Sequence, residues 1–225
     1  MGTDIHMACE IRENGQWNTL KKRAFKNAWY KEDSDYEPFT HEFTEVPYNC
    51  RCYNLFGILA DVRNGSGFAG CRIGEPFIPI CKPKGLPDDI CEETYAYLSN
   101  EHTPSFLTLE ELEQYDWTRM HRDYGIITEE EYRGSIMHGK NPESWCGGVD
   151  GPGIVILTET EMVDLIFRKR KRISEERYYT SCYFNPSTYA ECSGGFYDEV
   201  LPVLRTLDPK GGTNEDVRIV FDFDS

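Results

Sequence analysis

Two segments near opposite ends of the chain alternate apolar and polar residues with a period of two. Their apolar positions are Ile5, Met7, Cys9 and Ile11 in the first segment, and Val217, Ile219, Phe221 and Phe223 in the second. This period predicts two β-strands, each with one face buried in a core. The pair Asn14-Gly15 suits a tight hairpin turn, so residues 17–20 are expected to return beside the first strand.

Most helical signals lie between these two segments. Apolar residues recur at helical spacing over 53–63, which places Arg63 in a last turn before the Asn64-Gly65 stop. Thr108, Thr128 and Thr158 are each followed three residues later by glutamate, the pattern of an N-terminal capping box. The sequence therefore predicts an α+β fold, in which strands near both termini form an antiparallel or mixed sheet with helices packed on one side.

The predicted organisation is a single domain over residues 1–225, because neither half holds enough predicted strands for a sheet of its own. Residues 21–50 and 138–153 have no clear period and are expected to be long loops or lids within that domain. Several aromatic residues in the first of these loops need a surface to pack on.

The chain is strongly acidic, with 39 Asp and Glu against 24 Lys and Arg and a net charge of −15. Such a charge repels phosphate backbones, so nucleic acid is not expected as the main partner. The one basic run, residues 168–172, can bind phosphate, but the alternative is a solvated helix end.

Nine cysteines without a Cys-x-x-Cys pair do not resemble a disulfide framework. The N-terminal residues contain no apolar leader, and no segment has the apolar length of a membrane span. A cytoplasmic protein with free thiols and no membrane contact is expected.

Asp4 and His6 are the first candidate catalytic residues. Positions i and i+2 of a strand project from the same face, so a carboxylate and an imidazole can reach one ligand atom or one divalent metal ion. If the last strand lies beside the first, Asp222 and Asp224 can join them as further metal ligands. The alternative is that all four side chains are structural or solvate a sheet face and its edge. No cofactor is predicted, although a divalent metal fits this set.

The segment from Arg63 to Gly70 is the second candidate site. Arg63 and Asn64, followed by Ser66 and Phe68 in a glycine-rich loop, can hold a phosphate and stack on a base or sugar. The loop is not a phosphate-binding P-loop, because no Lys-Ser or Lys-Thr follows it. The alternative is a helix end with a flexible turn.

His102 and Ser105 form a third candidate pair, suggestive of a nucleophile and its base. No nucleophile elbow surrounds Ser105, so both are assigned to ligand binding. Cys50 and Cys52 can contribute to a zinc site only with two further ligands.

Several motifs occur along the chain in an order that resembles that of a known family. They are Met1-Gly2-x-Asp4-Ile5-His6, the segment Arg51-x-Tyr53-x-Leu55-Phe56-x-x-Leu59-Ala60-x-Val62-Arg63-Asn64, then Gly85-Leu86-Pro87, Ser105-Phe106-Leu107-Thr108-Leu109, and the tail from Asp216 to Phe221 with Phe223-Asp224. The order resembles a family of uncharacterised proteins encoded by bacteriophages and bacterial genomes. Cys52 and residues 159–186 depart from its pattern. The resemblance implies a phage origin and a role in the cytoplasm of an infected bacterium, and it implies no activity.

Two functions remain open from the sequence: the grouping of Asp4, His6, Arg63 and Asn64 favours the first, which we prefer, and the acidic charge favours the alternative. In the first, the protein binds a phosphorylated small molecule, such as a host defence signalling nucleotide, and hydrolyses it with the help of a metal. In the second, it is a non-enzymatic acidic protein that binds and inhibits a basic host protein. The sequence does not indicate an oligomeric state.

Overall fold

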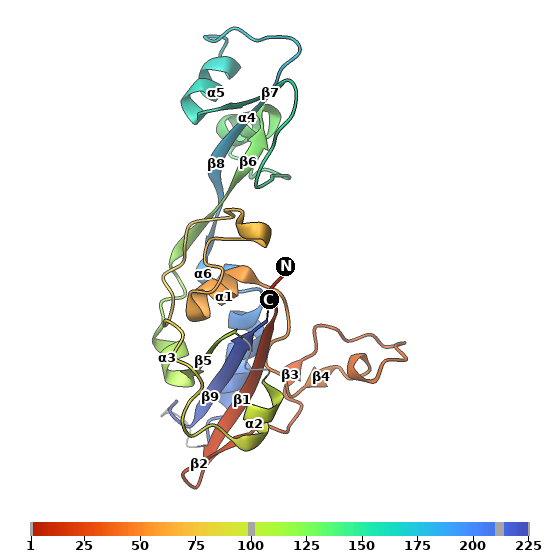
Figure 1. Cartoon of the computed structure of the whole chain (residues 1–225), viewed down its shortest axis with the longest axis vertical. Helices are drawn as coiled ribbons and strands as arrows, with labels where there is room; N and C mark the ends of the chain where they lie inside the picture. Colours follow the sequence, from red (N-terminus) through yellow and green to blue (C-terminus); the bar gives the residue numbers. More distant parts are fainter. Residues whose placement is uncertain (1, 99–101, 210–213, 225) are drawn as a thin grey trace. The chain divides into compact units, whose positions relative to one another are not determined.

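The computed structural model describes residues 2–98, 102–209 and 214–224, and it confirms an α+β fold with strands from both ends of the chain (Figure 1). The chain divides into two compact units. Unit 1 comprises Met1–Asn64, Phe77–Arg119 and Thr188–Ser225, and unit 2 comprises Gly65–Pro76 and Met120–Ser187. Each unit contains a sheet and a core of its own, which the sequence argument for one domain did not anticipate. Whether the chain folds as one domain stays a prediction.

The sheet of unit 1 joins the two ends of the chain. Its strand order is β2-β1-β9-β5. The strands are β1 (Ile5–Glu13), β2 (Gln16–Thr19), β5 (His102–Thr108) and β9 (Val217–Phe223). The last strand, β9, lies antiparallel between β1 and β5, with Ile5 opposite Phe223 and Ile11 opposite Val217. The predicted pairing of the last strand with the first is therefore confirmed.

One face of this sheet carries the apolar core of unit 1. The alternating side chains of β1 and β9 pack there with residues of three helical segments. These segments are α1 (Tyr53–Ala60), α3 (Leu109–Gln114) and the C-terminal pair formed by the π-helical turn η3 (Phe196–Val200) and α7 (Leu201–Thr206). Every residue of β9 is buried, because β9 has a strand on each side and is covered on both faces.

The opposite face of the same sheet holds a buried ion pair. Glu10 of β1 and Arg218 of β9 lie opposite each other in the register, and their side chains are 0% and 4% exposed. Residues that lead into α2 (Glu92–Tyr97) cover this pair, because Asp89 binds Arg218 and the backbone N–H of Cys91 donates to Glu10. The second face is therefore covered by polar contacts.

Unit 2 contains a three-stranded sheet of order β6-β8-β7. Its elements are β6 (Met120–Thr128), α4 (Glu129–His138), β7 (Ile154–Leu157), α5 (Glu159–Ile166) and β8 (Arg177–Thr188). The β7 and β8 strands are parallel, and side chains such as Ile127, Met162 and Leu165 form a second, smaller core. Residues 138–153, expected as a long loop, connect α4 to β7, and Cys146 in this loop bridges to Ile126.

Four helices are capped by a threonine that ends the preceding strand or directly follows it. Thr108, Thr128, Thr158 and Thr188 each accept a hydrogen bond from the backbone N–H of the residue three positions later. The helices that they begin are α3, α4, α5 and α6 (Tyr189–Cys192). Three of these caps were predicted from Thr-x-x-Glu, and the fourth was missed although it has the same pattern.

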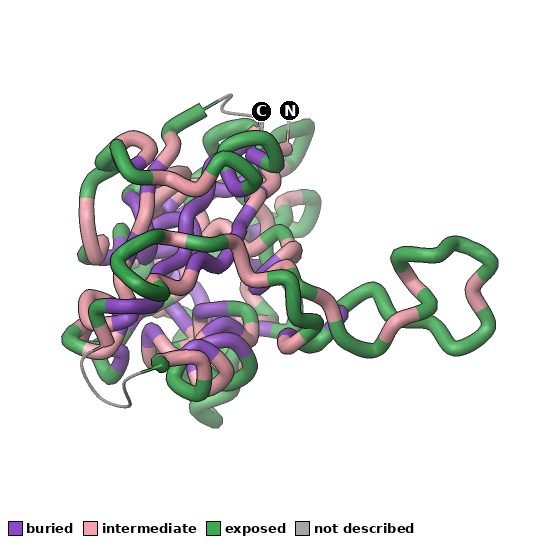
Figure 2. The backbone as a smooth tube through the Cα atoms, turned by 90° about the horizontal axis from the view of Figure 1, so that it is seen from below, coloured by how far each residue is buried: buried purple, intermediate pink, exposed green. Residues whose placement is uncertain are grey.

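The long segment after β2 is an ordered excursion from unit 1. It contains the short strands β3 (Phe25–Lys26) and β4 (Phe43–Thr44), with a 3-10 turn η1 (Glu37–Phe39) between them. Most of its backbone is exposed, as the loop at the right of Figure 2 shows. Among the helices that the structure describes, none is long and apolar enough to cross a membrane.

Candidate functional site

The predicted polar residues Asp4, His6, Asp222 and Asp224 meet where β1 begins and β9 ends. His6 is opposite Asp222 in the register, and its Nε2 lies 3.5 Å from Oδ2 of Asp224. The other oxygen of Asp224 accepts the backbone N–H of Asp4 at 2.6 Å. Asp222 is fully buried, whereas His6 and Asp224 are about one-third exposed. An imidazole beside a carboxylate can accept a proton from a ligand.

The carboxylate of Asp4 is held by Arg51. The guanidinium donates to both oxygens of Asp4, with 2.7 Å between Nε and Oδ1. These hydrogen bonds lower the pKa of Asp4 more than partial burial raises it, and the nearby charge of His6 lowers it further. A Cβ at Gly2 would lie 2.4 Å from Arg51, so glycine permits this close approach. The ion pair between Asp4 and Arg51 therefore joins the start of β1 to the segment before α1.

Among the residues that the structure describes, no three His, Cys, Asp or Glu side chains are arranged to hold a metal ion. The predicted metal set of Asp4, His6, Asp222 and Asp224 is gathered in one region, but Asp4 already uses both oxygens in binding Arg51. A metal role for these residues therefore stays a prediction.

Arg63 does not lie in a last helical turn, which corrects the sequence prediction. The helix α1 ends at Ala60 because Asp61 adopts a left-handed conformation with φ of 60°. Arg63 follows, also left-handed, and its Nε donates to the hydroxyl of Thr3 at 2.8 Å. Its guanidinium lies 5.5 Å from the ring centroid of Tyr53, and Tyr53 accepts the N–H of Thr3. Arg63 thus binds the start of β1 beside Asp4.

Asn64 links the two points of the chain between which unit 1 is interrupted by residues 65–76. Its side-chain oxygen accepts the backbone N–H of Phe77 at 2.6 Å, and its amide nitrogen donates to the carbonyl of Phe77 at 2.8 Å. Gly57 lies against this amide, where a Cβ would come within 2.9 Å of the oxygen. Residues 65–76 belong to unit 2. The two hydrogen bonds from Asn64 to Phe77 therefore hold together the points at which the chain leaves unit 1 and returns to it. The Asn64 side chain therefore has a structural role that the sequence pattern did not indicate.

Ser66 and Phe68 belong to unit 2, whereas Arg63 and Asn64 belong to unit 1. The glycine-rich loop folds back on itself as a short hairpin, in which Ser66 bridges to Arg72 and Gly67 donates to the carbonyl of Cys71. Phe68 is 65% exposed near its tip. The hypothesis of a phosphate held by this loop and Arg63 together stays a prediction.

His102 and Ser105 both lie on β5, a strand that was not predicted. A bulge separates them, with Thr103 in a left-handed conformation. Ser105 is fully buried, and its hydroxyl accepts the backbone N–H of Lys84 at 3.2 Å. A buried hydroxyl that binds backbone is placed to stabilise the fold, while His102 is exposed at the beginning of the strand.

Residues 27–43, which we call the arm, carry aromatic side chains that do not enter the core. Trp29, Tyr30, Tyr36 and Phe43 are between 41% and 61% exposed. Trp29 stacks on Phe39 at 6.3 Å, and Tyr36 meets Phe39 edge-on at 4.9 Å. Single exposed aromatic residues are ordinary, but several gathered on one segment form the kind of apolar patch that marks an interaction surface. The aromatic residues of the loop 21–50 were predicted to need a surface to pack on. Phe25 does pack in the core of unit 1, whereas Trp29, Tyr30, Tyr36 and Phe43 of the arm face solvent.

Hydrogen bonds give the arm a defined shape. The buried side chain of Asn27 donates to the carbonyls of Pro38 and His41, both at 2.8 Å, and accepts the N–H of Trp29. Lys31 donates its backbone N–H to the carbonyl of Phe39. The arm also carries five acidic residues against the single Lys31; these are Glu32, Asp33, Asp35, Glu37 and Glu42. It is therefore an ordered, acidic surface with aromatic groups at its centre.

Comparison of the chain with protein-family models, with curated protein sequences and with solved structures found no match.

Proposed function

We propose that this protein acts by binding a basic protein through the arm and that it blocks a surface of that partner. The observation that carries the proposal is the group of exposed aromatic side chains on a hydrogen-bonded, acid-rich arm. Tyrosine and tryptophan are the residues that most often dominate binding energy at protein interfaces. Acidic residues around them favour a cationic partner and speed its encounter.

The partner is a protein of the bacterial cell if the implied phage origin holds. A non-enzymatic role is preferred to binding of a phosphorylated small molecule, because two of the residues chosen for phosphate binding already hold structural bonds, from Arg63 to Thr3 and from Asn64 to Phe77. An acidic surface, in contrast, suits a cationic protein and opposes an anionic ligand.

The test compares the wild type with the double variant Trp29→Ala, Tyr36→Ala in affinity capture from a bacterial lysate. Tyr95→Ala is the matched control, because Tyr95 is 54% exposed on α2 of the same unit. We expect at least one basic protein to be captured by the wild type and the control but lost with the arm variant. The captured protein is then purified, and its dissociation constant is measured by calorimetry.

Removing two interface aromatic groups should weaken binding by at least 30-fold, since one such residue is worth about 2 kcal/mol or more. Asn27→Ala keeps every aromatic group but loosens the arm, and it should weaken binding by a smaller factor. Binding should also weaken as the salt concentration rises, because charge attracts the partner. Equal capture by all variants, or an affinity that does not respond to the arm variant, would show that the arm is not the docking surface.

A further inference from the structure

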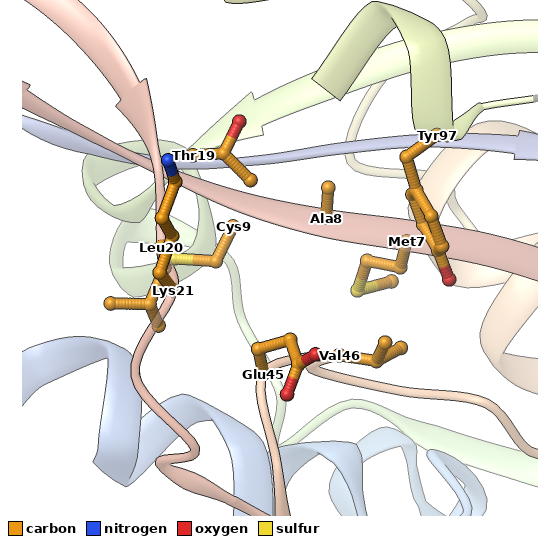
Figure 3. Close-up of a pocket in the computed structure, with 9 residues that line it drawn as sticks. All are labelled: Met7, Ala8, Cys9, Thr19, Leu20, Lys21, Glu45, Val46 and Tyr97. Carbon is orange, nitrogen blue, oxygen red and sulfur yellow. The ribbon is translucent and has the colours of Figure 1, made fainter. Parts of the chain in front are cut away.

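Two cavities of unit 1 differ in the chemistry of their walls. The first, of about 270 Å³, lies beside β1 (Figure 3). Met7 and Cys9 in its wall are 0% and 1% exposed, and Lys21 is paired with Glu93, so this cavity shows no chemistry that would select a ligand. The second, of about 170 Å³, lies between the segment after α3 and the helical elements η3 and α7. Its walls are aromatic.

Three aromatic rings line the second cavity. The ring of Tyr115 meets the indole of Trp117 edge-on, with 5.1 Å between their centroids, and the ring of Tyr197 lies 5.4 Å from the same indole. Trp117 is 5% exposed, whereas Tyr115 and Tyr197 are partly exposed. The accessible aromatic surface therefore belongs mainly to the two tyrosines.

Hydrogen bonds fix the positions of these rings. The indole N–H of Trp117 donates to the carbonyl of Leu112 at 2.8 Å, and the hydroxyl of Tyr115 donates to the carbonyl of Ile78. The backbone carbonyl of Trp117 accepts the N–H of Ala190 at 3.0 Å. The aromatic walls are thus in place before a ligand arrives, which lowers the entropy cost of binding.

The charges around the cavity favour a cation. Its lining contains two acids, Glu113 and Asp116, against the single base Arg205, a net charge of −1. Glu113 neutralises Arg205, because its two oxygens accept from Nε at 2.6 Å and from Nη2 at 3.2 Å. Asp116 is 54% exposed and forms a surface ion pair with Arg119 at 3.5 Å, a kind of pair that is weak in water. Hydrogen bonds from Thr118 lower the pKa of Asp116, so this carboxylate is ionised at neutral pH.

We propose that this cavity binds a methylated ammonium head group, carried by a small organic cation or by a methylated lysine side chain. The face of an aromatic ring is negative and attracts a cation that lies within about 6 Å of the ring centre. The rings select the ligand, and the acids at the mouth of the cavity add a weaker attraction.

The interior of the cavity explains the preference for a methylated nitrogen. Behind the rings lie the buried side chains of Leu112 and Leu201, which offer no acceptor for the N–H donors of a bare ammonium group. An apolar cavity of about 150 Å³ admits benzene, so about 170 Å³ is enough for a trimethylammonium group. The residues that form this site lie outside the arm, and the proposal does not depend on the arm.

The probe is choline, titrated into the whole protein at constant ionic strength and followed by calorimetry and NMR. We expect a dissociation constant below about 1 mM and a shift of the indole N–H signal of Trp117. The matched control ligand is the uncharged analogue of choline in which carbon replaces the ammonium nitrogen. It has the same shape, and it should bind at least about tenfold more weakly because the rings attract charge. A peptide that contains trimethyllysine is the second arm, and the tighter of the two cations identifies the source of the head group.

Variants of Tyr197 supply the matched test on the protein. Tyr197→Phe keeps the ring and should bind choline within about threefold of the wild type, whereas Tyr197→Leu keeps an apolar side chain without a ring and should lose at least about tenfold. A melting curve close to that of the wild type shows that each variant is folded. The arm variant Trp29→Ala, Tyr36→Ala should bind choline as the wild type does, so this proposal and the arm proposal can fail separately.

Three outcomes would overturn the proposal. The first is the absence of choline binding to the wild type at about ten times the expected dissociation constant. The second is equal affinity for choline and its uncharged analogue, which needs no variant to measure and would reduce the site to an apolar cavity. The third is equal affinity of folded Tyr197→Leu and Tyr197→Phe for choline, because the ring would then have no part in binding.

Discussion

Replacing Glu10 by alanine tests the buried ion pair that joins the first and last strands of unit 1. Glu10 accepts from two nitrogens of Arg218 at 2.7 Å, and its other oxygen accepts the N–H of Cys91 at 2.8 Å. Arg218 also binds Asp89 at 2.7 Å and lies 4.0 Å from the ring centroid of Trp17. Every polar group of the carboxylate is therefore engaged away from water.

The loss in unfolding free energy should be large, because Glu10→Ala leaves the Arg218 guanidinium buried with Asp89 as its remaining acidic partner. Breaking a buried ion pair from one side costs about 3–5 kcal/mol. The double change Glu10→Leu, Arg218→Met removes both charges and fills similar volume, so the ion-pair cost disappears. The buried N–H of Cys91 still loses its acceptor, at about 1–3 kcal/mol. The double variant is therefore expected to be more stable than Glu10→Ala.

The assay is native-state hydrogen exchange of β9 amides, which reports the unfolding free energy of unit 1. It is applied to the wild type, to Glu10→Ala, to the single variants Glu10→Leu and Arg218→Met, and to the double variant that combines these last two changes. The single changes and the double change form a cycle whose coupling energy isolates the pair. Raising the salt concentration should hardly alter this coupling, because the pair is not exposed to ions. A loss below about 1 kcal/mol for Glu10→Ala, or a double variant as unstable as the sum of the singles, would refute the reasoning.

Two further predictions follow from titratable groups. Three carboxylates have lowered pKa values in the folded state because they accept hydrogen bonds. Asp4 accepts from Arg51, Asp89 accepts from Arg218, and Glu161 accepts from Thr158 and Arg170. A carboxylate with a lowered pKa contributes stability above its unfolded value, here 3.8 or 4.5, and loses it as the pH falls through the folded value. The urea midpoint of unfolding should thus be constant from pH 7 to 5 and decrease below about pH 4. If the decrease is smaller in the variant Arg51→Gln, part of the pH dependence is due to Asp4. Burial raises the pKa of Cys9 and raises that of Cys182 to about 11, whereas Cys71 is exposed. At pH 8 a thiol reagent should therefore label Cys71 before Cys9 and Cys182, and in denaturant it should label all nine cysteines; early labelling of Cys9 would contradict its buried position.

Local patterns predicted those parts of the fold that local physics determines. The alternation in β1 and β9 follows from one buried face, and the Asn14-Gly15 turn has the left-handed backbone that the pair suggested. Three of the four threonine caps were predicted for the same reason, since a cap depends on residues three apart. These signals need no knowledge of distant contacts.

The missed elements depend on distant contacts. The β5 strand contains Pro104 and a bulge, so its pattern shows no clear period, and it forms because β9 provides a ladder beside it. The apolar run of residues 77–80 is typical of a short strand, but Phe77 is bound by the amide of Asn64, and Ile80 donates to the carbonyl of Ile58. Glu10 and Arg218 are 208 residues apart in sequence, and charged residues in a strand usually indicate a solvated face.

The candidate site shows the same division. Strand parity and the pairing of β1 with β9 were enough to bring His6, Asp222 and Asp224 together. The partners that engage Asp4, Arg63 and Asn64 come from loops, and no periodicity reports them. A motif of polar residues can therefore be maintained by the fold as well as by a ligand, and only the contacts distinguish the two causes.

The distribution of charge between the two units supports the choice of the arm as the proposed docking surface. Unit 2 contains 10 Lys and Arg against 12 Asp and Glu, a charge of −2, so unit 1 carries the remaining −13 of the total of −15. The basic run in unit 2 is largely neutralised, because Lys169, Arg170 and Arg172 pair with Asp164, Glu161 and Glu129. The negative field therefore originates in the unit that holds the arm. Under the proposed function, a basic protein attracted by that field reaches the same unit that carries the exposed aromatic groups.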